Sequence, residues 1–246
     1  TDKKTLFLWP EGIIPNINQS ELKKFKFLFN DKFNKNHLLG IGINSYEIKN
    51  NENTFYNSLS FYDNELNLVN SYNKVNLVPF GEFLPFEELL NNFGLKKITE
   101  GYGSYLKGTV NKNILLDKMN ILPLICYEII FTDLIQKSDD KTNLIVNISE
   151  DGWFGKSIGP DQHFAKSIFR AIENNTFLLR STNRGVSAII DNKGNIVKRI
   201  NRNEAGNIEF DVPLIRSNKV KNDLIFFLLL ITYLSIFLIY RKKNAK

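Results

Sequence analysis

The sequence predicts an α/β fold in which strands alternate with helices, followed by one membrane helix near the C-terminus. Short apolar runs with the length of buried strands recur along the chain, and segments with helical periodicity lie between them. Residues 224–240 contain no charged side chain and precede a basic tail. With 246 residues, of which 43% are hydrophobic, the chain can bury one large core.

The clearest predicted helix covers residues 160–175 and starts behind Gly159-Pro160, a favourable beginning for a helix. A hairpin is expected over residues 185–200, with a turn at Asn192-Lys193-Gly194. This hairpin, together with the alternation of strands and helices, favours a layered α/β arrangement. Further helices are expected at 20–33, 85–93 and 129–137, and strands at 5–9, 38–48, 55–62, 113–117, 119–126, 143–149, 177–182, 185–191 and 207–211.

The net charge of +6 does not indicate a nucleic-acid-binding protein. Four of the 32 basic side chains lie in the last six residues, RKKNAK, which leaves 28 basic against 26 acidic side chains in the rest. A groove for a phosphate backbone needs clustered basic residues in the folded part, and the sequence shows no such cluster. Two histidines and one cysteine also make a clustered zinc or iron site unexpected, so no metal or other cofactor is predicted.

Residues 224–240 are predicted to form a transmembrane helix. At about 1.5 Å per residue the stretch spans roughly 25 Å, slightly less than a bilayer core of about 30 Å, and Lys221 and Arg241 can reach the interfaces. The alternative is a buried C-terminal helix, which would normally show a polar stripe. Because more basic residues follow the stretch than precede it, the C-terminus is expected in the cytoplasm and residues 1–220 on the opposite face.

The chain divides into a folded domain at 1–215, a linker at 216–223, the membrane helix at 224–240 and a basic cytoplasmic tail at 241–246. The sequence opens in what reads as a core strand, TLFLWPEG, without a signal peptide. We therefore expect an N-terminally truncated chain whose export signal or further membrane spans lie in a missing part.

Three polar residues stand where predicted strands end or begin. Glu11 follows LFLWP, Lys74 lies in YNKVNLVPF, and Cys126 ends ILPLIC. A thiol needs a nearby base and a cation to act as a nucleophile. Glu11 would take its proton, Lys74 would favour the thiolate and later the oxyanion, and Cys126 would form a thioester. Taken singly, each residue has a plainer explanation, as a buried apolar cysteine or a solvated charge.

His163 is the one histidine that could replace Glu11 as the base for this cysteine, which would give a Cys–His hydrolase. Its place beside Phe164 on a predicted helix favours a structural role.

Five motifs in order resemble the bacterial apolipoprotein N-acyltransferase family, of the nitrilase or carbon–nitrogen hydrolase superfamily. The resemblance covers roughly residues 5–240 and implies a four-layer α-β-β-α nitrilase-like sandwich followed by a membrane helix. The motifs are WPEG at 9–12, YNKVNLVPFGEFLP at 72–85, ICYE at 125–128, DGWFGKSIGPDQHF at 151–164 and LLRSTNRGVSA at 178–188.

The resemblance implies a role for each matching residue. Glu11 matches the general base, Lys74 the catalytic lysine and Cys126 the nucleophile of the family. Glu82 matches a second glutamate that supports the lysine and the acyl transfer. Two further residues, Tyr127 and Glu128, match positions that shape the pocket.

Four other positions near the implied site are less determined. Trp153 and Phe154 are candidates for lining the acyl channel, or equally for packing in the core. Glu150 and Arg184 depart from the family pattern, in which an asparagine and a small or neutral residue are commoner.

The implied reaction moves an acyl chain from a phospholipid to a cysteine thioester, and then to the N-terminal amine of a diacylglyceryl-cysteine lipoprotein. The implied partners are the phospholipid donor, the lipoprotein acceptor and the bacterial inner membrane, with the catalytic domain on the periplasmic side. We expect a monomer without a nucleic-acid partner, and a chain that is inactive alone. The alternatives are a membrane-anchored nitrilase-type amidase acting on a small amide, and a non-enzymatic binding module with an inert Cys126.

Overall fold

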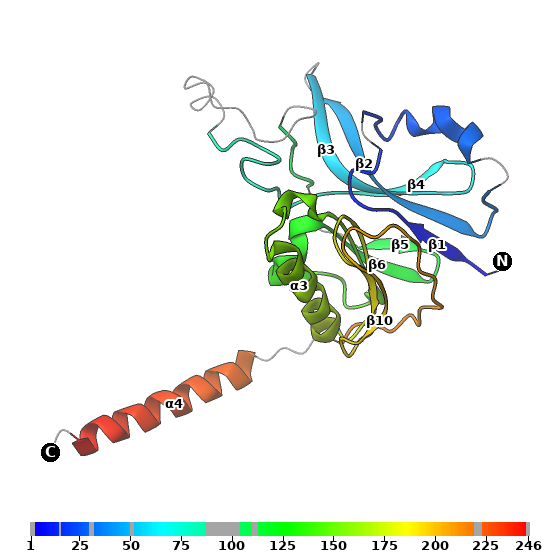
Figure 1. Ribbon diagram of the computed structural model, residues 1–246. Helices are drawn as coiled ribbons and strands as arrows, with labels where there is room; N and C mark the ends of the chain where they lie inside the picture. Colours follow the sequence, from blue (N-terminus) through cyan, green and yellow to red (C-terminus); the bar gives the residue numbers. More distant parts are fainter. Residues whose placement is uncertain are drawn as a thin grey trace.

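The computed structural model describes residues 3–14, 16–29, 32–49, 52–86, 104–109, 113–218 and 223–244. Its folded part contains two sheets packed face to face (Figure 1). One sheet has four strands in the order β1-β2-β3-β4, and the other has six in the order β10-β9-β8-β7-β6-β5. The predicted α/β fold is thereby confirmed, while the helix expected at 85–93 falls almost wholly outside the described residues.

The strands are β1 (Thr5–Leu8), β2 (His37–Lys49), β3 (Glu52–Tyr62), β4 (Leu68–Asn73), β5 (Ile114–Leu116), β6 (Met119–Ile125), β7 (Leu144–Glu150), β8 (Leu178–Asn183), β9 (Ser187–Ile190) and β10 (Ile196–Ile200). The described helices are η1 (Leu22–Leu28), η2 (Cys126–Ile130), α2 (Thr132–Gln136), η3 (Asp151–Phe154), α3 (Gly159–Asn174) and α4 (Asp223–Asn244), where η marks a 3-10 helix.

The four-stranded sheet is built on a long antiparallel hairpin. Strands β2 and β3 pair from Leu39–Tyr62 to Lys49–Glu52, with β1 parallel to β2 on one side and β4 antiparallel to β3 on the other. The sequence did not predict β4. This strand lies at the sheet edge and buries only Tyr72, so its apolar alternation is weak.

Parallel strands β6, β7 and β8 form the centre of the six-stranded sheet. Strands β6 and β7 are almost continuously buried, as is typical of parallel strands covered on both faces. Because the three strands run in one direction, their carboxyl ends meet at one edge of the sheet. The predicted hairpin is confirmed as β9 and β10, which pair antiparallel beside β8.

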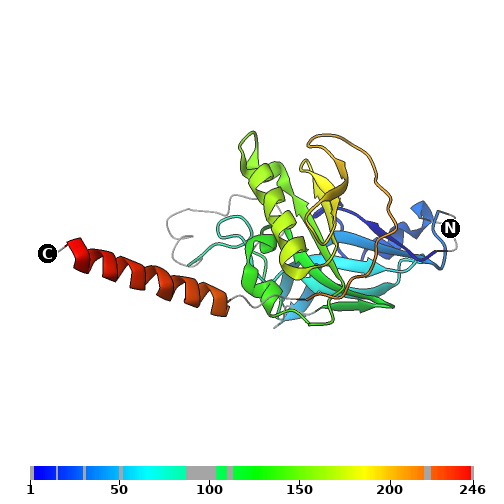
Figure 2. The ribbon, with the colours of Figure 1, turned by 90° about the horizontal axis from the view of Figure 1, so that it is seen from below.

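Three apolar clusters show how the layers are stacked. One lies between the sheets and includes Phe61 and Ile148, and a second packs the six-stranded sheet against α2 and α3. Figures 1 and 2 show α3 along the outer face of this sheet. A third cluster, around Leu22, covers the outer face of the four-stranded sheet.

Two predicted elements differ from the structure. The helix expected at 20–33 is the shorter 3-10 helix η1, in which Leu22 is the only buried residue. The strand expected at 207–211 pairs with no neighbour. Its alternating pattern arises because Ile208 and Val212 pack against the core between the sheets and Phe210 stacks on Phe177, while Glu209 and Asp211 are exposed.

Helix α4 carries the apolar stretch near the C-terminus. The window Ile225–Lys242 has a mean hydropathy of 1.8, and none of it is buried against the rest of the chain. The helix is long and apolar enough to cross a membrane.

Candidate active site

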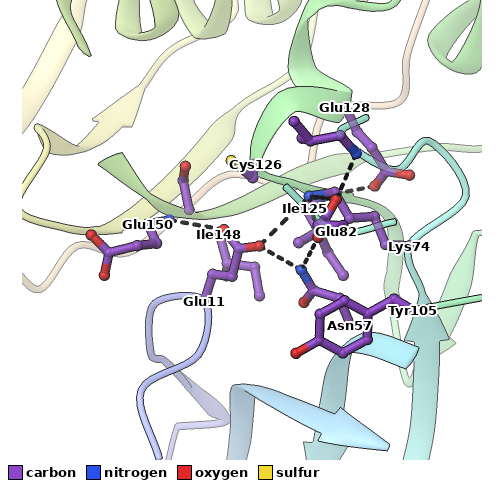
Figure 3. A network of polar contacts seen from close by, with 12 residues as sticks. Glu11, Asn57, Lys74, Glu82, Tyr105, Ile125, Cys126, Glu128, Ile148 and Glu150 are labelled. Carbon is purple, nitrogen blue, oxygen red and sulfur yellow. Dashed lines mark hydrogen bonds and ion pairs between the residues drawn. The ribbon is translucent and has the colours of Figure 1, made fainter. Parts of the chain in front are cut away.

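The structure brings Glu11, Lys74 and Cys126 to one place from three separate elements (Figure 3). Glu11 lies in the turn after β1, Lys74 directly follows β4, and Cys126 follows β6 as the first residue of η2. The four-stranded sheet supplies the acid and the amine, and the six-stranded sheet supplies the thiol.

The turn that carries Glu11 packs directly on the backbone of β2. A Cβ atom at Gly42 would lie 2.3 Å from the Pro10 carbonyl oxygen and 2.6 Å from the Glu11 Cα. Such distances are well inside van der Waals contact, so only glycine allows this turn to reach its position.

Lys74 is fully buried between two carboxylates. Its Nζ lies 2.9 Å from Glu82 Oε2, 3.0 Å from Glu82 Oε1 and 3.6 Å from Glu11 Oε1. Burial alone would lower the pKa of this amine, but the negative charges of Glu11 and Glu82 outweigh that effect and raise it. Lys74 is therefore a fixed cation at neutral pH.

Glu82 and Asn57 form a frame around this lysine. The Asn57 side-chain amide donates to Glu11 Oε1 at 2.6 Å and to Glu82 Oε1 at 2.7 Å, and the Val78 N–H donates to Glu82 Oε2 at 2.8 Å. The resemblance predicted that Glu82 supports the lysine, and the contact exists. Sequence reasoning missed Asn57, because a polar residue within a strand gives no signal of which carboxylates it will meet across the fold.

Glu11 keeps one acceptor position open. A carboxylate offers about four lone-pair sites. Among the described residues, Asn57 and Lys74 approach Oε1, and the Glu150 N–H donates to Oε2 at 2.9 Å. Since no other donor to Oε2 is found in the described part of the chain, one site on this oxygen can accept a proton.

Cys126 is buried and holds an unusual backbone conformation. Its φ is 51°, in the left-handed region that non-glycine residues rarely adopt. Burial and the charge of Glu11 raise the pKa of the thiol to about 12, against the lowering effects of Lys74 and of a hydrogen bond with Ser149. Lys74 favours the thiolate, but burial has the larger effect on the pKa of the thiol.

Glu128 ties the lysine segment to the cysteine segment. Its Oε1 accepts from the Tyr72 hydroxyl at 2.9 Å and the Val75 N–H at 2.7 Å, while Oε2 accepts from the Ile125 N–H at 2.8 Å. Burial raises the pKa of this carboxyl, and the hydrogen bonds oppose that shift. Glu128 thus joins the end of β4 to the end of β6.

The predicted aromatic residues differ in their surroundings. Tyr127 is half-buried and meets the Phe131 ring edge-on at 5.0 Å between centroids. Trp153 is 65% exposed and so is not packed in the core. Phe154 lies 5.5 Å from the His163 ring, centroid to centroid.

Glu150 reaches Glu11 through its backbone and not through its side chain. Its carboxylate instead accepts from the Gly152 N–H at 2.7 Å and from the Asn183 amide at 2.5 Å. Burial raises its pKa. Arg184 is exposed, with a φ of 60°.

His163 contacts the backbone of the cysteine and not the thiol. Its Nε2 lies 3.0 Å from the Cys126 carbonyl oxygen, and its Nδ1 lies 2.9 Å from Asp151 Oδ1. This arrangement disfavours a Cys–His pair. Among the described residues, no group of three or more His, Cys, Asp or Glu side chains is arranged to hold a metal ion.

Known proteins share much of the sequence of this chain. Residues 6–222 match the carbon-nitrogen hydrolase family. The apolipoprotein N-acyltransferase of Rhizobium leguminosarum bv. trifolii is 36% identical over 217 residues, covering 85% of this chain and 40% of that protein. The apolipoprotein N-acyltransferase of Rickettsia typhi is 34% identical over 213 residues, covering 85% and 42%. The chain therefore spans about two fifths of the length of these relatives.

Solved structures share the fold. Nit3 of Saccharomyces cerevisiae, a member of branch 10 of the nitrilase superfamily, superposes with a TM-score of 0.57 at 19% identity, covering 82% of this chain and 74% of Nit3. A carbon-nitrogen hydrolase from Helicobacter pylori G27 gives a TM-score of 0.53 at 12% identity, covering 74% and 63%. With the family match over residues 6–222, the chain belongs to the carbon-nitrogen hydrolase family, as a homologue of the apolipoprotein N-acyltransferases.

Proposed function

We propose that this chain carries the catalytic domain of an apolipoprotein N-acyltransferase. In this reaction Cys126 accepts an acyl chain from a phospholipid and passes it to the N-terminal amine of a diacylglyceryl-cysteine lipoprotein. The main support is the convergence of a buried thiol, the Lys74 cation and the open acceptor position of Glu11. The relatives that share about 35% of residues supply the substrate class.

In the first half-reaction the thiol attacks the ester carbonyl of the phospholipid. The sulfur–carbon bond forms as the thiol proton passes to Glu11, because a thiol with a pKa near 12 needs a base during attack. The Lys74 ammonium faces the negative charge that develops on the carbonyl oxygen. The ester carbon–oxygen bond then breaks, and Glu11 returns the proton to the departing lysophospholipid.

In the second half-reaction the lipoprotein amine attacks the thioester. An N-terminal amine has a reference pKa of about 7.7–8.0, so an ammonium form loses one proton before attack. The neutral amine then gives a second proton to Glu11 as its bond to the acyl carbon forms, and one N–H remains in the amide. The carbon–sulfur bond breaks, an amide forms, and Cys126 regains its proton. The two half-reactions therefore use the same three residues and no cofactor.

The proposed substrates place the domain at a membrane surface. Both the donor and the acceptor are lipids, and α4 would anchor the domain beside them. The basic tail after α4 favours a cytoplasmic C-terminus and a periplasmic catalytic domain in the bacterial inner membrane.

The proposal is tested in proteoliposomes. Because the chain matches only part of its relatives, it is assayed alone and as an extended protein, joined to the part of the Rickettsia typhi relative that it does not match. The extended protein should move a labelled acyl chain from phosphatidylethanolamine to a diacylglyceryl peptide, and the chain alone should not. Cys126→Ala should reduce transfer at least about a thousandfold, as for loss of a nucleophile; transfer that survives this change would refute the proposal.

A further inference from the structure

Helix α3 places a histidine directly behind the proposed nucleophile. The His163 side chain is 3% exposed, and its Nε2 lies 3.0 Å from the Cys126 carbonyl oxygen. A carbonyl oxygen only accepts hydrogen bonds, so Nε2 must carry the proton and donate it. The ring is therefore hydrogen-bonded to the backbone of Cys126 and not to its sulfur.

A buried ion pair fixes this ring from its other side. Asp151 Oδ1 lies 2.9 Å from His163 Nδ1, and Arg180 Nη2 lies 3.1 Å from the same nitrogen and donates to Asp151 Oδ2 at 2.8 Å. The side chains of Asp151 and Arg180 have no exposed surface. Buried charges are costly unless they are paired, so Asp151 and Arg180 stay together and hold the imidazole in one orientation.

The same carboxylate also reaches the thiol through a serine. The Ser149 hydroxyl donates to Asp151 Oδ1 at 2.7 Å, and the Ser149 side chain lies close enough to Cys126 to lower the pKa of its thiol. Gly185 leaves the necessary space, because a Cβ atom there would lie 2.1 Å from Asp151 Oδ2. Asp151 therefore contacts both His163, which reaches the backbone of Cys126, and Ser149, which lies near its thiol.

The backbone of Cys126 needs such support. A non-glycine residue in the left-handed region is disfavoured, and it persists only where its surroundings hold it. With φ at 51°, the direction in which the Cys126 side chain leaves the backbone depends on this conformation. The hydrogen bond from His163 to the Cys126 carbonyl is the described contact that acts on it from α3.

We infer that His163, held by Asp151 and Arg180, is a positioning residue for acylation of Cys126. It keeps the nucleophile in the left-handed conformation that aims the sulfur at its base and its cation. The inference rests on the proposed role of Cys126 as nucleophile. It goes beyond that role by assigning a function to a histidine that touches neither substrate nor thiol.

The test is a pre-steady-state burst with p-nitrophenyl butyrate on the purified 246-residue chain in detergent. Cys126 attacks the ester, the sulfur–carbon bond forms, the thiol proton passes to Glu11, and p-nitrophenolate leaves. This activated, soluble ester requires only the nucleophile and its base. Two variants separate the contacts of the ring: His163→Gln can still donate to the Cys126 carbonyl, whereas His163→Asn reaches Asp151 but not the carbonyl.

We expect His163→Asn to slow the saturating burst rate about tenfold, with little change in the ester concentration for half-saturation. His163→Gln should stay within about threefold of the unmodified chain. Arg170→Gln is the matched control, because it alters a buried residue seven positions further along α3, away from Cys126. Equal burst rates for the two His163 variants would overturn the inference. So would a slowing of His163→Asn that Arg170→Gln shows equally at the same loss of thermal stability.

Two further results distinguish failure of the inference about His163 from failure of the proposed function. No burst in the unmodified chain would instead contradict Cys126 as nucleophile, and so the proposed function. Should the His163 variants not fold, ¹⁵N spectra of the unmodified chain decide, with His37→Gln identifying the second histidine. They should show a proton on His163 Nε2, and a bare Nε2 would overturn the inference.

Discussion

The thiol of Cys126 is neutral at rest, and this single property shapes the proposed chemistry. Burial keeps its pKa near 12 although Lys74 lies within electrostatic reach. The base must therefore act during attack and not before it. Glu11 suits this role, since Asn57, Lys74 and the Glu150 N–H hold its carboxylate in place and leave one acceptor site open.

The reactivity of Cys126 toward iodoacetamide should reflect this raised pKa. At pH 8 the folded chain should react more than about a hundredfold slower than the same chain in urea, because only the thiolate is alkylated. As the only cysteine, Cys126 makes the mass change unambiguous. Between about pH 9 and 12 the unfolded chain releases the thiol proton first, so the stability of the fold should fall as pH rises. Equal labelling of folded and unfolded chains would contradict this account.

How far the site can be predicted differs from residue to residue. Glu11, Lys74 and Cys126 could be proposed as site residues because each lies in a family motif and beside the end of a predicted strand. Asn57 could not, since its two carboxylate partners come from other parts of the sequence and meet it only in the folded structure. The left-handed backbone of Cys126 likewise leaves no trace in its residue type.

At the scale of elements, the site depends on how closely the turn after β1 approaches β2. The parallel centre of the six-stranded sheet was predictable from its buried apolar runs, which place Cys126 at a strand end. Strand β4, which delivers Lys74, was not predictable, because an edge strand buries one face only in part. The contact of the Pro10-Glu11 turn with Gly42 was not predictable either, because it forms only when both segments are folded.

Gly42→Ala tests this close approach. The added methyl group would overlap the Pro10 carbonyl and push Glu11 away, so we expect a loss of about 1–3 kcal/mol in unfolding free energy. The burst with p-nitrophenyl butyrate should also slow, about tenfold or more. Gly206→Ala is the matched control, because a Cβ there meets nothing closer than 3.7 Å. If both variants have the same unfolding free energy and the same burst rate, the position of the turn does not depend on Gly42.

At the scale of the whole molecule, a folded α/β domain is joined to an exposed apolar helix. The composition predicted both parts, since the apolar stretch is uninterrupted and the basic excess lies beyond it. The outer layer over the four-stranded sheet was predicted less well, because η1 is a short 3-10 helix with one buried residue. A lipid-to-lipid transfer explains why such a domain would need a membrane anchor.

Removing α4 should release the domain from membranes. A chain ending at residue 222 should appear in the supernatant after carbonate extraction of vesicles, whereas the 246-residue chain should stay in the pellet. Leu229→Arg with Leu234→Arg is the control that keeps the helix length but places charges within the bilayer, and it should behave like the shortened chain. Extraction of the 246-residue chain by carbonate would show that α4 is not an anchor.

The most direct test of the proposed chemistry is the mass of the peptide that contains Cys126. After incubation of the extended protein with a phospholipid carrying a labelled acyl chain, and without acceptor, this peptide should gain the mass of that chain through a bond that hydroxylamine cleaves. Glu11→Gln should abolish the adduct while the fold persists. An adduct on any other residue, or none in a preparation that transfers acyl chains, would contradict the account.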